Sequence, residues 1–268
     1  MFLKVKKRRI KDLNNKVSIS AAIVLYKEDL EELRDTIHSF LEVPLSKKLY
    51  LIDNTPNSEF EDQFAGSKDV VYIANSENVG FGKAHNQVKE LIAETSEYHL
   101  ILNPDVAFEA TVIPNLIERF SEDKELAMIA PKVLFPDGRH QYSCRKYPSF
   151  FELLIRRLGP LKSLFRKQIE KGEYRDLNLS KSFYPEYITG CFQLYKTVDF
   201  MAIEGFDERY FLYMEDVDIC KKIDELGKKK RYEPSEIVVH NLKQGSSKSP
   251  LLFIYHLSSA VKYFKKWT

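Results

Sequence analysis

Residues 17–26 have the sequence VSISAAIVLY, which is apolar at most positions. A strand with one exposed face alternates apolar and polar residues, whereas a strand buried on both faces of a parallel sheet does not. An acidic segment with helical spacing follows from about Glu28 to Leu41. The two segments predict a strand followed by a helix, which is the repeating unit of a parallel sheet.

The same alternation of strand and helix continues to residue 121. The sequence predicts strands at 48–53, 70–74 and 98–102, and helices near 58–64, 82–94 and 111–121. This order is typical of an α/β fold with a Rossmann-like, mostly parallel sheet flanked by helices. After Met128 the alternation weakens, although 187–196 predicts a strand with an internal glycine and 237–239 predicts a short strand.

The composition of the 268 residues is that of a globular chain. Its 41 Lys and Arg residues nearly balance its 39 Asp and Glu residues, so no overall charge attracts nucleic acid and no such partner is expected. Cys144, Cys191 and Cys220 form neither a disulfide framework nor a CxxC metal site, which favours a reducing, cytoplasmic setting. No apolar run approaches the roughly 20 residues that span a bilayer. We therefore expect a soluble or membrane-peripheral protein.

Both ends of the chain carry positive charge. Residues 1–16 predict a basic arm outside the fold, either as a solvated tail or as a segment attracted to anionic lipid. Residues 249–268 predict a basic amphipathic helix that packs on the domain, forms a homodimer or contacts a membrane. One side of this helix should carry the apolar residues Phe253, Leu257, Val261 and Phe264. Residues 156–182 are rich in charge and predict a mobile or partly helical insertion.

Polar clusters follow three of the predicted strands. They are Asp53-Asn54, residues 75–86 and Asn103-Pro104-Asp105. The carboxyl ends of parallel strands meet at one edge of a sheet, where ligands bind, so the three clusters predict a single crevice. Asp53 could accept hydrogen bonds there from a nucleobase or a ribose.

The second cluster contains the segment NVGFGKAHN at residues 78–86. Its glycines, Gly80 and Gly82, allow the backbone to approach a ligand closely. Lys83 and Asn86 can face that ligand from the first turn of a helix. The segment lacks both the GxGxxG pattern and the Walker A pattern, which argues against dinucleotide and P-loop sites.

Asn103-Pro104-Asp105 places a carboxylate at the mouth of the crevice, where it suits a hard divalent cation that carries a diphosphate. The tripeptide is also ordinary turn chemistry, but the strand before it and the helix after it favour a ligand site. His240 follows a short apolar strand and is either structural or a metal ligand through its neutral imidazole. Residues 243–248, KQGSSK, predict a phosphate-facing lid or a linker.

Three carboxylates occur within four residues in Glu215-Asp216-Val217-Asp218, directly after an aromatic run. Acidic residues stabilise a helix N-terminus, but the aromatic neighbours would exclude water and raise the proton affinity of a general base. Val217, Cys220, Ile223 and Leu226 predict one buried stripe on this helix, with Gly227 as its C-cap. Arg145 either provides a fork for a phosphate or sugar hydroxyl or lies on the surface.

Eight motifs occur in a fixed order: AIVLY, LIDN, NSENVGFGKAHN, LNPDV, YSCRKYPS, TGCFQLYK, GFDERYFLYMEDVDIC and VVH. Together they resemble those of the inverting glycosyltransferases of family 2, which have a GT-A fold. They are most similar to bacterial rhamnosyltransferases that build O-antigen, capsule or other cell-wall polysaccharides. The resemblance extends from about Ser18 to His240. It implies a GT-A domain at 17–248, with a nucleotide-binding half at about 17–125 and an acceptor and catalytic half at about 126–248.

The resemblance also implies roles for individual residues. Asp216 would be the catalytic base, with Glu215 beside it. Asp105 and His240 would bind a divalent cation, Mg²⁺ or Mn²⁺, although Asn103 replaces the first acid of the family's DxD motif. The implied donor-binding residues are Tyr26, Asp53, Asn78, Gly80, Lys83, Asn86, Asn103, Arg145, Gly190 and Cys191.

The reaction implied by the resemblance is transfer of a sugar, L-rhamnose from dTDP-L-rhamnose, to a glycan hydroxyl by a single displacement. The implied acceptor is a glycan on a polyprenyl diphosphate at the cytoplasmic face of the membrane. Three alternatives remain open: a transferase of the same fold with a different nucleotide sugar, a non-catalytic nucleotide-sugar-binding or scaffold protein, and a nucleic-acid-binding module that uses the basic arm.

Overall fold

A computed structural model describes residues 18–58, 60–64, 67–155, 164–242 and 250–268. The predicted basic arm at 1–16 and the KQGSSK segment at 243–248 lie outside the described residues, as does the first part of the predicted insertion, at 156–163.

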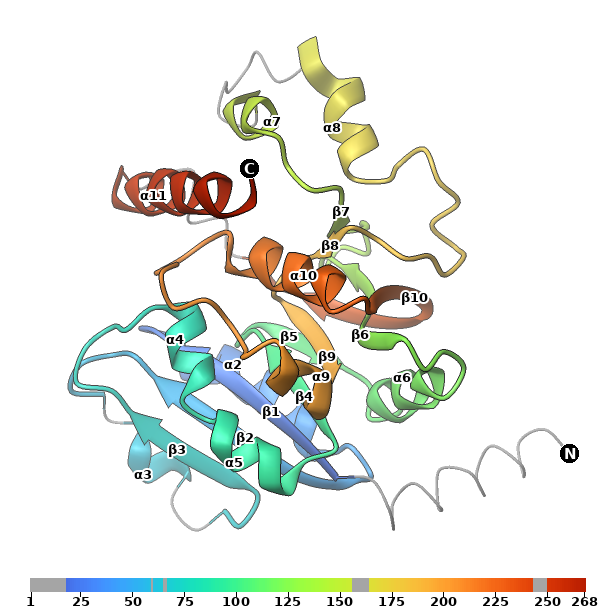
Figure 1. The fold of residues 1–268 in the computed structure, drawn as a ribbon. Coiled ribbons are helices and arrows are strands. Elements are labelled where there is room, and N and C mark those ends of the chain that lie inside the picture. Colours follow the sequence, from blue (N-terminus) through green and yellow to red (C-terminus); the bar gives the residue numbers. More distant parts are fainter. Residues whose placement is uncertain (1–17, 59, 65–66, 156–163, 243–249) are drawn as a thin grey trace, which may run out of the picture.

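Within the described residues, eight strands form one sheet (Figure 1). Their order across the sheet is β3 (Val70–Ala74), β2 (Ser46–Asp53), β1 (Ser18–Leu25), β4 (Tyr98–Leu102), β9 (Phe192–Lys196), β6 (Leu126–Leu134), β10 (Lys229–His240) and β5 (Val106–Phe108). The neighbours from β3 to β4 are parallel, as are β6 and β10, whereas β9 and β5 run antiparallel to their neighbours. The predicted α/β fold with a mostly parallel sheet is confirmed.

Helices cover both faces of this sheet. The longer ones are α2 (Leu30–Leu41), α6 (Val112–Phe120), α10 (Glu215–Glu225) and α11 (Pro250–Trp267). The shorter ones are α3 (Glu61–Phe64), α4 (Phe81–Asn86), α5 (Lys89–Thr95), α7 (Phe150–Ile155), α8 (Arg166–Gly172) and α9 (Thr197–Ala202). A second sheet pairs β7 (Cys144–Arg145) with β8 (Tyr187–Ile188) beside α10. Helix α8 confirms that the predicted insertion is partly helical.

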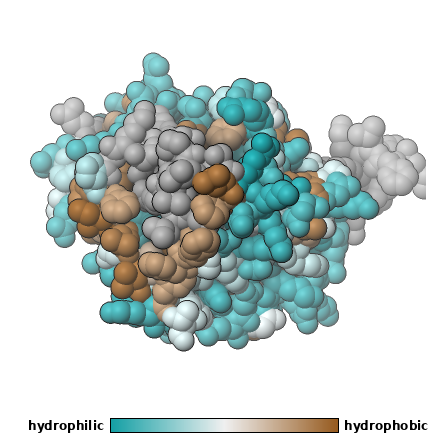
Figure 2. Space-filling model, turned by 90° about the horizontal axis from the view of Figure 1, so that it is seen from above, coloured by the Kyte–Doolittle hydropathy of each residue, from teal (hydrophilic) through white to brown (hydrophobic). Residues whose placement is uncertain are grey.

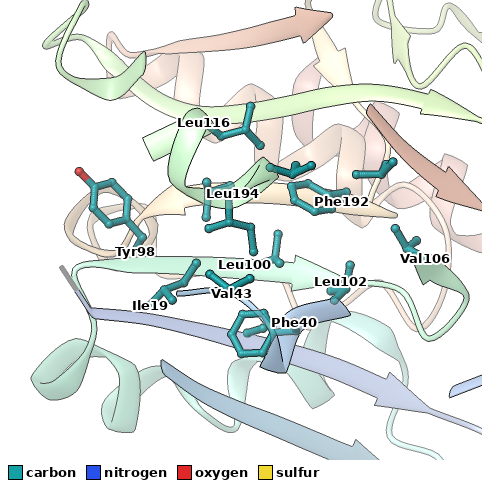
Figure 3. Close-up of a cluster of buried hydrophobic side chains, with 14 of the residues drawn as sticks. Ile19, Phe40, Val43, Tyr98, Leu100, Leu102, Val106, Leu116, Phe192 and Leu194 are labelled. Atoms are coloured by element: carbon teal, nitrogen blue, oxygen red, sulfur yellow. The ribbon is translucent and has the colours of Figure 1, made fainter. Parts of the chain in front are cut away.

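Strand β1 explains why the core has two halves, one on each face of the sheet. Ile19 and Ile23 of β1 point to the layer formed by α2 and α6, and Figure 3 shows this cluster. Ala22 points to the opposite layer, which contains α4, α5, α9 and α10. Because apolar residues face both layers, β1 is buried on both sides, as its sequence predicts. Helix α2 begins two residues later than predicted because Asp29 caps it, accepting hydrogen bonds from the backbone N–H groups of Glu31 and Glu32.

Two predicted elements are interrupted in the structure. The single helix predicted at 82–94 is two helices, α4 and α5, because the chain leaves helical geometry at Val88. The strand predicted at 187–196 is β8 and β9, which belong to different sheets. The backbone at Thr189 bonds to Ser143 and that at Cys191 bonds to Asn103, so the chain crosses between the sheets at Gly190.

Strands β6 and β10 were not predicted at their full lengths. The sequence of β10 contains charged residues that are rare in buried strands. In the structure Lys230 of β10 pairs with Asp224, and Arg231 pairs with Glu122 and Glu233. Glu233 belongs to β10 itself, but Asp224 lies on α10 and Glu122 follows α6, so the sequence of the strand alone does not reveal how its charges are neutralised.

The buried stripe predicted on helix α10 is present only in part. Val217, Cys220 and Ile223 are buried, but Leu226 is 39% exposed because it lies at the helix end. Gly227 has a φ of 71° and closes the helix with hydrogen bonds from its own N–H to Asp224 and from the next N–H to Ile223. The predicted glycine cap is confirmed. No helix in the described part of the chain has the length and apolar character to cross a membrane.

Candidate functional site

Three pockets lie in a row at the carboxyl ends of the parallel strands. Pocket A, of about 320 Å³, contains residues that follow β1, β2, β3 and β4. Pocket B, of about 330 Å³, shares Phe81, Asn103 and two leucines with pocket A. Pocket C, of about 210 Å³, shares Arg145 and the Glu215-Asp216 pair with pocket B. The predicted crevice is therefore present and extends from the strand ends to α10.

Pocket A is shaped by the loop between β3 and α4. The Asn78 side-chain oxygen accepts hydrogen bonds from the Gly80 N–H at 2.9 Å and from Asn54 at 3.2 Å. Gly80 has a φ of 89°, and a Cβ atom there would lie 2.5 Å from the carbonyl oxygen of Phe211. Only glycine allows this close approach of the two backbones. Tyr26, 44% exposed, lines the same pocket.

Three of the predicted donor-binding residues do not line pockets A to C. Asp53 is fully buried and accepts hydrogen bonds from the Tyr72 hydroxyl at 2.6 Å and the Thr55 N–H at 2.7 Å. Asn86 bonds to the backbone of Phe206 through both its amide nitrogen and its oxygen. Lys83 is exposed on α4. The first two side chains are engaged in hydrogen bonds within the fold. Contact between the donor and any of the three residues stays a prediction.

Asp105 and His240 meet although 135 residues separate them. Oδ1 of Asp105 lies 3.0 Å from Nε2 of His240 and, apart from this contact, has no hydrogen-bond partner among the described residues. On the other side of the ring, Nδ1 of His240 lies 2.8 Å from Oε1 of Gln141. Burial lowers the pKa of His240, but hydrogen bonds to Asp105 and Cys191 outweigh burial and raise the pKa to about 10.

This arrangement fits a divalent cation that is shared with a bound ligand. Gln141 favours a proton on Nδ1 of His240, and Nε2, which at the raised pKa carries a proton toward Asp105, would release that proton to bind a cation. Asn103 adds an amide 3.4 Å from Nε2. Across the residues that the structure describes, no three His, Cys, Asp or Glu side chains group into a metal site. A cation here would therefore take further ligands from Asn103 or from the bound molecule.

The Glu215-Asp216 pair begins helix α10. The two preceding residues, Tyr213 and Met214, both have a positive φ, of 69° and 70°. Such backbone geometry costs free energy outside glycine, and it turns the chain sharply so that the two carboxyls lie at the boundary of pockets B and C. Asp216 accepts a hydrogen bond from the Val217 N–H at 2.9 Å. Oε2 of Glu215 is buried and has no hydrogen-bond partner in the described part of the chain.

The two carboxyls have different electrostatic surroundings. Burial, followed by repulsion from Asp216, raises the pKa of Glu215 to about 8. Burial also raises the pKa of Asp216, but hydrogen bonds from backbone N–H groups and the positive charge of Arg145 oppose it. Asp216 therefore has backbone donors and a cationic neighbour that favour its ionised form, whereas a like charge beside Glu215 favours its neutral form. An ionised Asp216 beside a neutral Glu215 can accept a proton from a bound hydroxyl.

Arg145 also lies at this boundary, since it lines both pocket B and pocket C. Its Nε donates a hydrogen bond to the carbonyl oxygen of Tyr142 at 3.1 Å, and its guanidinium lies 3.8 Å from Glu173. With a side chain that is 28% exposed, Arg145 is not on the open surface. Gly190 and Cys191 line pocket B opposite it.

Sequence reasoning did not identify several residues of this site. Gln141, which positions His240, directly precedes the motif YSCRKYPS, and Thr189, which lines pockets B and C, is the first residue of TGCFQLYK, but neither residue was assigned a role. Tyr213 lines the same two pockets. The aromatic run before Glu215 was the available signal for Tyr213, because it predicted that water is excluded there.

Comparison with curated proteins gives relatives that are rhamnosyltransferases. The chain is 26% identical over 196 residues to the rhamnosyltransferase WbbL of Escherichia coli K12, and the match covers 70% of each chain. It is 28% identical over 206 residues to the N-acetylglucosaminyl-diphospho-decaprenol L-rhamnosyltransferase of Mycobacterium tuberculosis. That match covers 72% of this chain and 66% of the relative.

Two solved structures share the fold at low sequence identity. One is GalNAc-T7 with UDP, GalNAc and Mn²⁺, with a TM-score of 0.63 and 16% identity over 89% of this chain and 47% of that chain. The other is the mannosyltransferase PcManGT from Pyrobaculum calidifontis with GDP-Man and Mn²⁺, with a TM-score of 0.60 and 14% identity. This match covers 98% of this chain and 71% of that chain. Both support the predicted GT-A fold. This chain spans about half the length of the GalNAc-T7 chain.

A family model described as glycosyl transferase family 2 matches residues 20–196, from the third residue of β1 to the end of β9. The match includes the strand ends that form pocket A and most of the residues of pocket B. It covers well over half of the sequence, and the chain therefore belongs to glycosyltransferase family 2.

Proposed function

We propose that the protein transfers L-rhamnose from a nucleotide diphospho-rhamnose, dTDP-L-rhamnose, to a hydroxyl of a lipid-linked glycan. The rhamnosyl donor is supported by the names of the two kinds of curated relative. A lipid-linked acceptor is supported by the decaprenol-linked acceptor in the name of the mycobacterial relative. In this proposal the reaction is one step of cell-surface polysaccharide synthesis at the cytoplasmic side of a membrane.

The row of pockets supports an assignment of the donor. The nucleoside occupies pocket A beside Tyr26 and Asn78, and the sugar occupies pocket B beside Gly190. The diphosphate then lies between them, near Asn103, Asp105 and His240. A divalent cation held by Asp105 and His240 would neutralise charge on the departing diphosphate.

One observation supports this function most directly: Glu215 and Asp216 line pocket B and pocket C at once. A base at that boundary can take the proton of an acceptor hydroxyl in pocket C while the oxygen attacks the sugar in pocket B. The new bond forms on the face opposite to the departing diphosphate, so the configuration of the sugar inverts. Asp216 is the proposed base because backbone N–H groups and the Arg145 cation favour its ionised form.

The catalytic assignment is tested by Asp216→Asn. This change keeps the size of the side chain and removes the base, so we expect transfer to fall by a factor of about 10²–10⁴. Donor binding should change little. Glu225→Gln is the matched control, because this exposed acid lies at the far end of the same helix. Near-normal turnover by Asp216→Asn would refute the assignment.

Donor choice is tested by thermal denaturation with thymidine, uridine and guanosine diphosphates and their sugars, with and without Mg²⁺ or Mn²⁺. A ligand that binds only the folded state raises the melting temperature by mass action. We expect the largest increase with the thymidine compounds, and we expect Asp105→Ala to lose the part of the increase that depends on the cation. A protein that binds these compounds but releases no nucleotide diphosphate with any acceptor would be a binding protein instead.

A further inference from the structure

Helix α11 has an exposed apolar side. Ile254, Leu257 and Val261 recur at intervals of three and four residues and are 58%, 49% and 44% exposed. This spacing places them on one side of the helix. Phe253 (45% exposed) and Leu251 (54% exposed) extend the same surface. Burying such side chains in the domain would be favourable, so their exposure requires an explanation.

The opposite side of α11 is firmly packed. Ser259, Ala260 and Tyr263 are buried against the domain. The Ser259 hydroxyl donates a hydrogen bond to the carbonyl oxygen of Leu212 at 2.9 Å, and the Trp267 indole donates one to Asp218 at 2.7 Å. These contacts fix the rotation of the helix about its axis. The apolar side is therefore presented outward by the fold itself.

Helix α7 extends the apolar surface. Phe150 and Phe151 are 61% and 56% exposed, and the Phe150 ring packs edge to face against Phe264 of α11 with centroids 5.9 Å apart. Leu164 is 74% exposed. Figure 2 views the molecule from the side where α7, α8 and α11 lie, and hydrophobic residues gather over part of this side. We call the exposed side chains of α7 and α11 the α7–α11 face.

The charges beside this face are mainly positive. Helix α11 contains no Asp or Glu, and its exposed Lys262 and Lys265 flank the apolar side. Lys266 is partly buried and is neutralised by Asp207 and Asp218. The acid of α7, Glu152, accepts a hydrogen bond from the N–H of Ser149. An apolar strip with flanking lysines is complementary to a bilayer whose headgroups are anionic.

Pocket C opens beside the same face. It is lined by His256 of α11 and by Leu153 and Glu152 of α7, together with the Glu215-Asp216 pair. A molecule in pocket C is therefore enclosed on one side by the two helices that carry the exposed apolar residues. If those helices lay on a bilayer, an acceptor anchored there would reach the carboxyls without leaving the membrane.

We propose that the α7–α11 face docks on an anionic lipid bilayer and that this docking places pocket C at the membrane surface. The second part rests on the proposed function, because it takes pocket C as the acceptor site. The docking itself does not, because lipid binding can be measured without any donor or acceptor.

The test is flotation of the full chain with vesicles of phosphatidylcholine alone and of phosphatidylcholine with phosphatidylglycerol at 3:1. We expect binding to the anionic vesicles, and we expect the triple variant Ile254→Gln, Leu257→Gln, Val261→Ser to bind at least tenfold more weakly. The matched control is the double variant Leu91→Gln, Val198→Ser, which changes apolar residues that are 47% and 71% exposed on other elements. It should bind as the unchanged protein does.

Several results would overturn the proposal. One is no vesicle binding by the unchanged protein, and another is equal binding by the triple variant, which would assign lipid attraction to the basic residues 1–16. A third is a dimer in light scattering that the triple variant converts to a monomer without any change in vesicle binding. Transfer to a short-chain, water-soluble acceptor should be unchanged in the triple variant, so a failure of docking and a failure of the proposed reaction give different results.

Discussion

Glu215 and Asp216 are neighbours in the sequence, but the fold gives them different electrostatic partners. The raised pKa of Glu215, about 8, means that this side chain is neutral at pH 7, and its Oε2 has no hydrogen-bond partner among the described residues. Glu215→Gln should therefore keep transfer at pH 7 within about tenfold of the unchanged protein, whereas Asp216→Asn should not. Comparing kcat/KM of the two variants separates the base from its neighbour.

The stability of the Glu215→Gln variant provides a second test. The unfolded chain ionises Glu215 near its ordinary pKa of 4.5, whereas the folded protein does so near 8. Between these values the unfolded state has released a proton that the native state keeps, so this residue lowers the free energy of unfolding as the pH rises from 4.5 to 8. The variant should gain more stability relative to the unchanged protein at pH 8 than at pH 5, as measured by urea denaturation. An equal difference at both pH values would contradict the raised pKa.

Gly80 decides the shape of pocket A. In Gly80→Ala the new Cβ would lie 2.5 Å from the Phe211 carbonyl oxygen, and the backbone has a positive φ as well. We expect destabilisation of more than about 1 kcal/mol and a clear loss of nucleotide affinity. Gly138→Ala is the control, because Gly138 has a φ of 82° but no atom within 4 Å of the added Cβ. Denaturation and nucleotide titration of both variants separate the clash from the cost of the backbone geometry.

Among the elements, α11 holds the loop that leads to the Glu215-Asp216 pair. Ser259 on its inner side bonds to the backbone of Leu212, and Lys262 at the edge bonds to the backbone of Arg209. The Tyr255 ring packs on Phe211 with centroids 4.6 Å apart. The Lys266 ammonium lies within 2.9 Å of both Asp218, which is fully buried, and Asp207. The helix therefore stabilises the same loop that lines pockets A and B.

Lys266→Met tests this role of α11. The change leaves the buried Asp218 carboxylate without its cation, although Tyr210 and Trp267 still donate hydrogen bonds to it. We expect the free energy of unfolding to fall by about 2 kcal/mol or more and the KM of the donor to rise. Lys265→Met removes an exposed lysine from the same turn and should change stability by less than about 0.5 kcal/mol. If both variants unfold at the same urea concentration, the inner side of α11 does not stabilise the loop.

For the whole molecule, two buried histidines set the response to acid. Burial lowers the pKa of His99 to about 3, and burial followed by repulsion from His99 lowers the pKa of His85 well below its ordinary 6.5. Neither ring nitrogen of His85 has a hydrogen-bond partner among the described residues. Below pH 6.5 the unfolded chain binds protons that the native protein does not, so the free energy of unfolding should decrease as the pH falls from about 6.5 toward 3.

The measurement is the urea midpoint at pH 7.5 and at pH 5. His85→Leu replaces one of the two rings by an apolar side chain of similar size and should reduce the decrease between these pH values. His38→Leu is the control, because His38 lies on the solvent side of α2 with a side chain that is 77% exposed. A decrease of the same size in the His85 variant would mean that other groups cause the acid sensitivity.

The sequence predicted the elements whose pattern is local. The strands at 70–74 and 98–102 and the glycine cap of α10 are where the sequence placed them. The break between α4 and α5 was missed because Ala84, Val88 and Ile92 are all buried and keep a helical spacing across it. Strand β10 was largely missed because its charged residues are neutralised by partners on other elements, Asp224 on α10 and Glu122 after α6.

By itself, the sequence determined the α/β class, the family and the polar motifs at the strand ends, because each depends on residues that are close together in the chain. Only the tertiary structure decided that Asp105 meets His240, that Glu215 and Asp216 stand between two pockets, and that the apolar side of α11 faces outward. These features depend on contacts between distant segments. The pattern of one segment shows that it has an apolar side, but which surface that side meets is set by the packing of all the others.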